Sequence, residues 1–261
     1  MSYFARAILG LLLFIPSLLF AQSVQWQEIH PGIWKGVAGK PDSYDLLKAA
    51  AVMPSPALQK LEKASFPLNQ TDINAKVING KTYLRFPLER NEQIFGFGLN
   101  FQSIHQRGQI LQLHADHYGK SDNGRTHAPV PFYVSSQGYG IFVNSARYID
   151  VYAGSGVRKD SKNPPEVQDR NTDDNWSARP YSDAVEMLVP AEGVEIYVFA
   201  GPKPVNAIER FNLLSGGGCL PPRWGLGFTQ RVNRLYTSEQ VKQEAKDFEQ
   251  KGFPQIGRAH V

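Results

Sequence analysis

The stretch PFYVSSQGYGIFVN, residues 131–144, decides the fold. Its two ends, 131–135 and 140–144, are short runs of aromatic and β-branched residues, which are typical of strands. Gln137-Gly138 lies between them, where glycine permits a tight turn. The stretch therefore predicts a β-hairpin, two neighbouring antiparallel strands.

Strand-like runs of the same kind extend in both directions, from Val24 to about Phe199. Asn79-Gly80, a strong signal for a two-residue hairpin, divides one of them, and Glu192-Gly193 joins the last two. The runs are 77–86, 148–152, 184–189 and 194–199. Many short strands with almost no helical periodicity predict a mainly β fold, an antiparallel β-sandwich over residues 22–201.

Two segments of this region do not have the pattern of strands. Residues 45–64 are helix-like, although Pro54 and Pro56 interrupt the periodicity. Residues 159–180 are polar and aperiodic, so we expect a long surface loop there.

The pattern changes after Gly201, and we expect a linker over residues 202–222. It contains a short helix at 205–214 and the flexible Ser215-Gly216-Gly217-Gly218. A buried strand is expected next, at 224–229.

A helix follows that strand. Thr237-Ser238-Glu239-Gln240 has the spacing of a capping box, and Gly252 provides a helix stop. One face of the helix carries Val241, Ala245 and Phe248. With the start of another strand at Phe253-Pro254, residues 223–254 predict the first β/α unit of a second domain.

The N-terminus, residues 1–21, is typical of a signal peptide. Arg6 precedes the apolar run 7–20, and the small Ala21 precedes the expected cleavage site. Pro16 and the short run argue against a membrane span, with an uncleaved anchor as the alternative. We expect a secreted or periplasmic protein that has no membrane contact after signal cleavage.

Charge and cysteine content argue against a nucleic-acid partner, an intramolecular disulfide and a cysteine-based metal site. The formal net charge is +4, but Lys and Arg are scattered singly, so we expect no nucleic-acid partner. The single cysteine, Cys219, can form neither an intramolecular disulfide nor a cysteine-based metal site. We expect no cofactor.

The last residues, 255–261, are too polar for a continuing buried strand, which should be apolar and β-branched. Ile256–Val261 is compatible with the codons ATC GGA AGA GCA CAC GTC, a run found in a widely used sequencing adapter. We therefore expect a non-native, adapter-derived tail, with a real polar tail as the alternative. The parent DNA distinguishes the two.

Two stretches carry a resemblance to a known family. EQIFGFGLNF, residues 92–101, with QRG at 106–108 and the hairpin that begins at Pro129, resembles the N-terminal sandwich of glycoside hydrolase family 31. LPPRWGLGF, residues 220–228, is similar to that family's entry into its catalytic barrel. The resemblance spans residues 90–254.

The resemblance implies a galactose-mutarotase-like antiparallel β-sandwich followed by the truncated start of a (β/α)8 barrel. It also implies retaining hydrolysis of an α-glycosidic bond in an oligosaccharide or glycoside, carried out by two carboxyl groups. In this family both are aspartates on later barrel strands. No catalytic residue is therefore assigned here, and we expect the chain alone to be inactive.

Three residues are candidates for substrate binding. The resemblance places Asp116 near the sugar pocket, where its carboxylate can accept hydrogen bonds from sugar hydroxyls. Gln230 and Arg231 end the first barrel-like strand, and such strand ends face the active site. A solvated turn or loop residue is the alternative for each. Phe228-Thr229-Gln230 lacks the tryptophan common among α-glucosidases, which leaves the sugar open.

Three histidines suggest a metal site, but their spacing does not support one. His114, His117 and His127 lack the i, i+4 register of a zinc-binding pair, so we expect no metal.

The expected function is a secreted α-glycosidase acting on α-linked glucose, xylose, galactose or an N-acetylated sugar. A non-catalytic carbohydrate-binding β-sandwich is the alternative, and the elements after Pro222 disfavour a purely structural β-protein. Further β/α units encoded beyond residue 254 indicate the enzyme, whereas a natural stop codon there indicates the binding module.

Overall fold

The computed structural model describes residues 24–49, 53–100, 103–116, 125–155, 181–218, 222, 226, 228–231, 235–253 and 255–259. The predicted signal peptide, the predicted loop at 159–180, His117 and Cys219 lie outside these residues. The chain divides into two compact units, Met1–Gly216 and Gly217–Val261. Within the described ranges, no helix is long and apolar enough to cross a bilayer.

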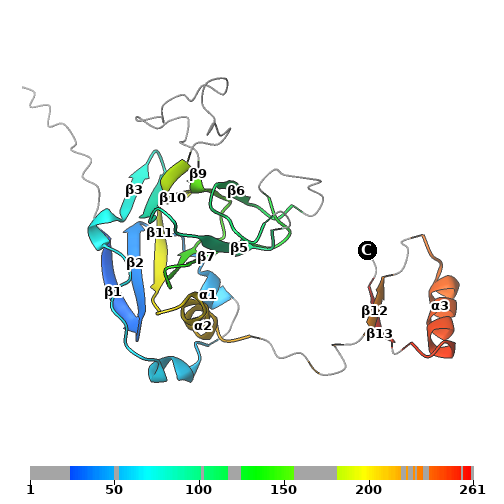
Figure 1. The fold of residues 1–261 in the computed structure, drawn as a ribbon. Helices are drawn as coiled ribbons and strands as arrows, with labels where there is room; N and C mark the ends of the chain where they lie inside the picture. Colours follow the sequence, from blue (N-terminus) through cyan, green and yellow to red (C-terminus); the bar gives the residue numbers. More distant parts are fainter. Residues whose placement is uncertain are drawn as a thin grey trace, which may run out of the picture. The chain divides into compact units, whose positions relative to one another are not determined.

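The first unit is built on two antiparallel sheets packed against each other (Figure 1). The six-stranded sheet has the order β1 (Gln25–His30), β2 (Ile33–Gly39), β11 (Gly193–Phe199), β8 (Gly140–Asn144), β7 (Pro129–Ser135) and β5 (Ile94–Gly98). The five-stranded sheet has the order β3 (Asn74–Ile78), β4 (Lys81–Pro87), β10 (Tyr181–Val189), β9 (Ile149–Ser155) and β6 (Gln109–Leu113). The predicted mainly β sandwich is confirmed.

The first hydrophobic core lies between the two sheets. Side chains alternate along β4, so that Thr82, Leu84 and Phe86 are fully buried while Tyr83 and Arg85 are only partly covered. Asn79 and Gly80 have φ angles of 51° and 73° in the turn before β4, as the Asn-Gly signal predicts.

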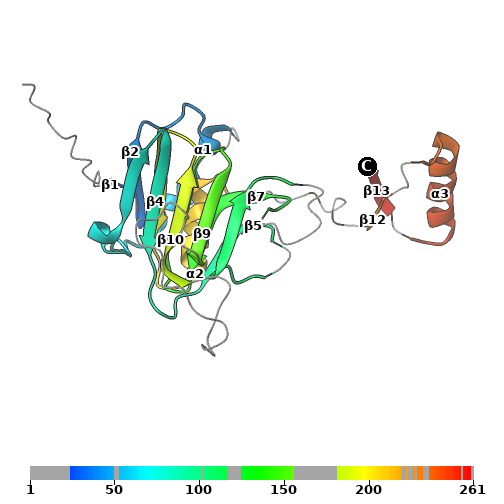
Figure 2. The same ribbon diagram turned by 90° about the horizontal axis from the view of Figure 1, so that it is seen from above.

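A second core covers the opposite face of the six-stranded sheet. α2 (Pro204–Leu214) packs there (Figure 2). Its Phe211 ring stacks on Phe132 at a centroid distance of 4.0 Å. All residues of β8 are buried, because Ile141 faces the first core and Phe142 the second. The hairpin at 131–144 is apolar on both faces because it separates two cores.

The helical segments refine two predictions. The helix predicted at 205–214 is α2, but its packing makes it part of the first unit rather than of a linker. The described residues of the helix-like region 45–64 form α1 (Leu46–Ala49) and the 3-10 turn η1 (Pro56–Lys60), and η1 begins at one of the two interrupting prolines, Pro56. Leu58 from η1 is buried in the second core.

Gly96-Phe97-Gly98 forms an irregular stretch of the edge strand β5. The register against β7 shifts between the two glycines, whose φ angles are 119° and 98°. A Cβ on Gly98 would lie 2.0 Å from the carbonyl oxygen of Ala128. The close approach and positive φ both require glycine, and they turn Phe97 fully into the core.

The second unit is a strand, helix and strand. β12 (Phe228–Arg231) pairs in parallel with β13 (Gln255–Ala259), and α3 (Ser238–Gln250) connects them. Thr237 and Gln240 form the predicted capping box, and Gly252 has a φ of 73°. The βαβ pattern is confirmed, whereas the complete barrel stays a prediction.

The strand β13 corrects one expectation. We expected the polar segment after Gln255 not to continue a strand, yet it pairs along β12 from Gln255 to Ala259. Strand pairing depends on backbone groups, so a polar sequence can take part in it. The adapter origin of this segment remains a prediction.

Candidate functional site

The loop that carries Asp116 leaves the edge strand β6 and is fixed by its own backbone. Ala115 forms an isolated parallel bridge with Thr126. The backbone N–H of Asp116 donates to the carbonyl of Thr126 at 3.0 Å, and that of Thr126 donates to the carbonyl of His114 at 3.4 Å. The backbone from His114 to Asp116 is therefore held against Thr126.

An ion pair orients the Asp116 carboxylate. Its Oδ2 lies 3.1 Å from Nη1 of Arg125, whose Nε donates to Oε1 of Gln112 at 3.0 Å. The Asp116 side chain is 21% exposed. A carboxylate has room for about four hydrogen bonds, so pairing with a guanidinium is chemically compatible with binding a sugar hydroxyl.

An aromatic pair stands beside this loop. The rings of His114 and Tyr148 stack with centroids 3.9 Å apart and an interplanar angle of 25°. The pairing of Leu113 with Ile149 brings them together, although they are 34 positions apart in sequence. Tyr148 is 64% exposed, which leaves an aromatic surface available for an incoming ring.

Thr126 connects the loop to the edge of the six-stranded sheet. Its side chain is buried, and its hydroxyl donates to the carbonyl of Leu99, just beyond β5. The N–H of Leu99 donates in turn to the carbonyl of Ala128 at 3.1 Å. The Asp116 loop is thus anchored both to β6 and to the end of β5.

The other two candidates lie in the second unit. Gln230 and Arg231 are the last residues of β12 and pair with Arg258 and Ala259 of β13. They do occupy a strand end, as predicted. The structure describes them separately from Asp116, so a shared pocket remains a prediction.

The histidines do not gather into a metal site in the part of the chain that is described. His114 stacks on Tyr148, and His127 is exposed on the other side of Thr126. No group of three or more His, Cys, Asp or Glu suited to a metal occurs among the described residues. The expectation that the protein binds no metal stays a prediction.

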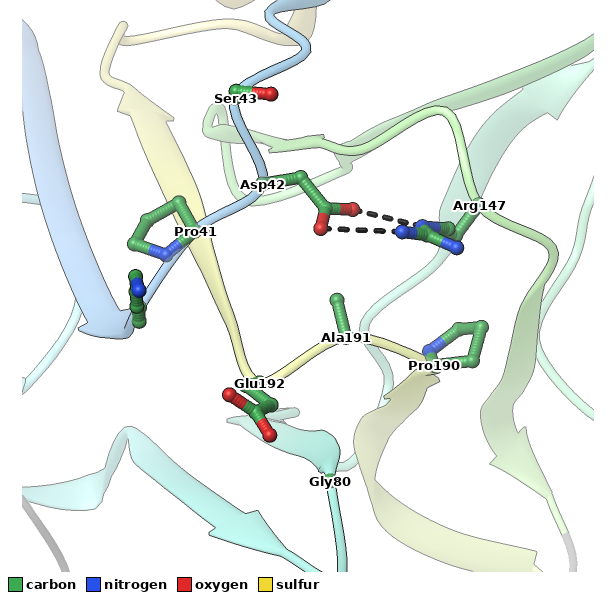
Figure 3. A pocket seen from close by; sticks show the side chains of 9 residues that line it. Pro41, Asp42, Ser43, Gly80, Arg147, Pro190, Ala191 and Glu192 are labelled. Carbon is green, nitrogen blue, oxygen red and sulfur yellow. Dashed lines mark hydrogen bonds and ion pairs between the residues drawn. The ribbon is translucent and has the colours of Figure 1, made fainter.

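A polar hollow, which the sequence did not reveal, lies among the turns of the sandwich (Figure 3). Its volume is about 530 Å3. It is lined by Lys40, Pro41, Asp42, Ser43, Gly80, Arg147, Pro190, Ala191 and Glu192. Three turns and the segment after β2 contribute these residues, and only the three-dimensional pairing of the strands brings them together.

Part of the sandwich is similar to a known domain family. The profile of the glycosyl hydrolase 31 N-terminal galactose mutarotase-like domain matches residues 55–151, which run from η1 to β9. Over these residues the sandwich is similar to the N-terminal domain of glycoside hydrolase family 31. The family 31 resemblance inferred from residues 90–254 is therefore confirmed.

Several glycoside hydrolases are similar to this chain in sequence. It is 26% identical over 180 residues to the α-xylosidase XylQ of Lactiplantibacillus pentosus, covering 66% of the chain and 20% of the relative. It is 38% identical over 71 residues to α-glucosidase 2 of Bacillus thermoamyloliquefaciens, covering 26% of the chain and 9% of the relative. The chain thus spans about a fifth of the xylosidase's length.

A solved family 31 structure has the same fold. The Flavobacterium johnsoniae dextranase, complexed with glucose, matches with a TM-score of 0.60 at 17% identity. The match covers 88% of this chain and 30% of the dextranase. At this level of identity the match supports the fold alone.

Proposed function

We propose that this chain is the N-terminal part of a family 31 α-glycosidase that hydrolyses α-linked glucosides or xylosides with retention of configuration. The observation that carries the proposal is the family's N-terminal domain itself, over residues 55–151. The relatives named α-xylosidase and α-glucosidase support the choice of sugars.

The chemistry requires two carboxyl groups about 5–5.5 Å apart. One attacks the anomeric carbon and forms a glycosyl-enzyme intermediate, while the other protonates the departing oxygen and later activates the water that releases the sugar. The family resemblance puts both groups on later barrel strands, so the 261-residue chain by itself should show no turnover.

In this proposal the Asp116 loop binds substrate and takes no part in bond cleavage. The Arg125 guanidinium holds the Asp116 carboxylate in one orientation, in which it accepts hydrogen bonds from sugar hydroxyls. Tyr148 offers a stacking surface for the C–H face of a ring. Gln230 and Arg231 would add polar contacts from the end of β12.

The test uses the product of the longer gene. It should cleave 4-nitrophenyl α-glucoside or α-xyloside, and NMR should detect the α-anomer as the first sugar released. Release of the β-anomer would contradict retention. A natural stop codon soon after residue 254 would favour the binding module instead.

The role of Asp116 has its own test in the same enzyme. Asp116→Asn should lower kcat/KM about 10-fold to 100-fold, since it removes a charged acceptor from the substrate. Asp72→Asn, which changes an exposed carboxylate in a 3-10 turn, is the matched control. Equal activity of the two variants would remove Asp116 from the substrate site.

Transfer to a sugar acceptor is a second candidate. The isomaltosyltransferase of Sporosarcina globispora is 25% identical over 160 residues, covering 61% of the chain and 13% of the relative. If the parent enzyme transfers glycosyl groups, adding an acceptor sugar should convert released monosaccharide into longer products. Unchanged hydrolysis products would exclude this alternative.

We also propose secretion, directed by residues 1–21. Protein recovered from the periplasm or medium should begin near Gln22. Mature protein that retains Met1 would contradict the proposal.

A further inference from the structure

The hollow around Asp42 and Arg147 has walls that are already fixed in place. The buried Thr82 hydroxyl donates to the carbonyl of Ala191 at 2.8 Å, and the N–H of Lys40 donates to the carbonyl of Glu192 at 2.9 Å. These bonds hold the turn between β10 and β11 against β4 and against the chain that leaves β2. A ligand therefore meets a formed surface and does not have to order it, which favours binding.

The segment after β2 is fixed at a second point. Asn144, buried at the end of β8, donates from Nδ2 to Oδ1 of Asp45 at 2.9 Å and accepts from the N–H of Leu46 at 2.9 Å. The N–H of Arg147 donates to the hydroxyl of Ser145 at 3.2 Å. Both sides of the hollow are thus tied to the same strand end.

The charged side chains in the hollow balance one another. Lys40 and Arg147 are positive, while Asp42 and Glu192 are negative. Nε and Nη2 of Arg147 donate to the two Asp42 oxygens at 2.8 and 3.3 Å (Figure 3). A surface without net charge attracts neither an anion nor a cation strongly, but it offers many hydrogen-bond donors and acceptors to a neutral polar ligand.

Apolar groups complete the lining. Pro41 and Pro190 present ring carbons on different walls, and Ala191 lies between the charged groups (Figure 3). A saccharide has the complementary chemistry, since its rim of hydroxyls alternates with C–H faces. The volume of about 530 Å3 lies within the range of small-molecule sites, about 300–1,000 Å3.

We propose that this hollow is a binding site for a neutral saccharide on the N-terminal sandwich itself. Arg147 and Asp42 bind the hydroxyls as one unit, and the proline rings contact the C–H faces. Only the choice of an α-glucan as ligand rests on the proposed function, because the site geometry is independent of catalysis.

The experiment titrates the 261-residue chain with isomaltotriose and records backbone amide shifts by NMR. We expect saturable shifts at Gly80, Ala191 and Glu192, with a Kd of about 1–10 mM, a weak affinity suited to an open polar site. Arg147→Ala should weaken binding about tenfold, the effect of losing one charged hydrogen-bond donor. Arg90→Ala, at an exposed position outside the hollow, should bind like the wild type.

Each other outcome overturns the proposal. Shifts confined to the Asp116 loop and abolished by Arg125→Ala would assign saccharide binding to that loop and leave the proposed function intact. Stronger binding of inorganic phosphate or glucuronate than of isomaltotriose would show that the ligand is anionic. Absence of any saturable shift would remove the hollow as a site, whereas the proposed function is tested separately by the turnover of the parent enzyme.

Discussion

The two amphipathic helices of this chain, α2 and α3, differ in what covers their apolar faces. α2 buries Ala207 and Leu214 and stacks Phe211 on the six-stranded sheet. No residue of α3 is buried, and Phe248 has a ring contact with Phe253 at 5.5 Å. Periodicity therefore predicts a helix and its apolar face, but it does not identify the element that packs against that face.

The two units therefore depend on different interactions. The sandwich has two continuous hydrophobic cores, so its stability comes from burial. In the described part of the second unit, the interactions are mainly local: a capping box, a glycine stop and two paired strands. Substitutions in the two units should affect the protein in correspondingly different ways.

The largest difference is expected from removing a phenylalanine in each unit. Phe86→Ala empties a fully buried position in the first core and should lower the free energy of unfolding of the sandwich by about 3–5 kcal/mol. Phe248→Ala in α3 should change it by less than about 0.5 kcal/mol. Urea denaturation followed by tryptophan fluorescence measures both, and equal effects would contradict the separation of the units.

Removing the buried carboxylate of Glu92 should have the next largest effect on the stability of the sandwich. It accepts hydrogen bonds from the hydroxyls of Ser135 and Tyr139, and from the N–H of Glu89 at 2.7 Å. Glu92→Ala leaves these donors without their acceptor and should destabilise the sandwich by about 3 kcal/mol.

Two variants test this explanation of the Glu92 effect. Glu92→Gln retains an acceptor oxygen and should be less destabilising than Glu92→Ala, while Glu89→Ala is an exposed control. If Glu92→Ala unfolded at the same urea concentration as the wild type, the network would not contribute to stability.

The strands and turns of the sandwich, and the start of α3 in the second unit, were predictable because their signals are local. Asn79-Gly80, the hairpin at 131–144 and the Thr237 capping box all carry the relevant residues within a few positions. The second core was not predictable, since nothing local indicates that Phe211 will stack on Phe132. Glu92 was missed for the same reason, as Tyr139 lies 47 positions away.

The candidate site also has one part that the sequence predicted and other parts that depend on contacts between distant segments. Asp116 was identified through the family resemblance, but its pairing with Arg125 depends on the Ala115–Thr126 bridge. The nearby stack of His114 on Tyr148 depends on the pairing of β6 with β9. The hollow is lined by residues from four separate segments, so no local sequence pattern indicates it.

A smaller effect is expected at the helix cap of the second unit. Thr237→Ala removes the hydroxyl that accepts from the N–H of Gln240 at 3.3 Å, and should destabilise α3 by about 1 kcal/mol. Ser238→Ala, one residue later, is the matched control. Circular dichroism should detect the loss of helix without a change in the unfolding of the sandwich, and a shift of that transition would show that the units are coupled.

The smallest effect is expected on the pH dependence of unfolding, through the carboxyl group of Glu195. Burial raises the pKa of this carboxyl, but Lys35, Asn144 and Tyr197 together outweigh burial and hold it below the ordinary value of 4.5. Because the folded-state pKa is lowered, the stabilisation is present above the ordinary pKa and is lost as the pH falls through the folded value. Glu195→Gln should reduce the pH dependence of unfolding in acid, whereas an unchanged profile would remove Glu195 as its cause.

The most direct test of the contrast between the units is amide hydrogen exchange of the intact chain, read by mass spectrometry. Peptides from β8 and β11 should exchange only through global unfolding of the sandwich, whereas peptides from α3 should exchange much faster through local opening. Equal, slow exchange in α3 and β8 would contradict the account, because it would require a packing partner for α3 within this chain.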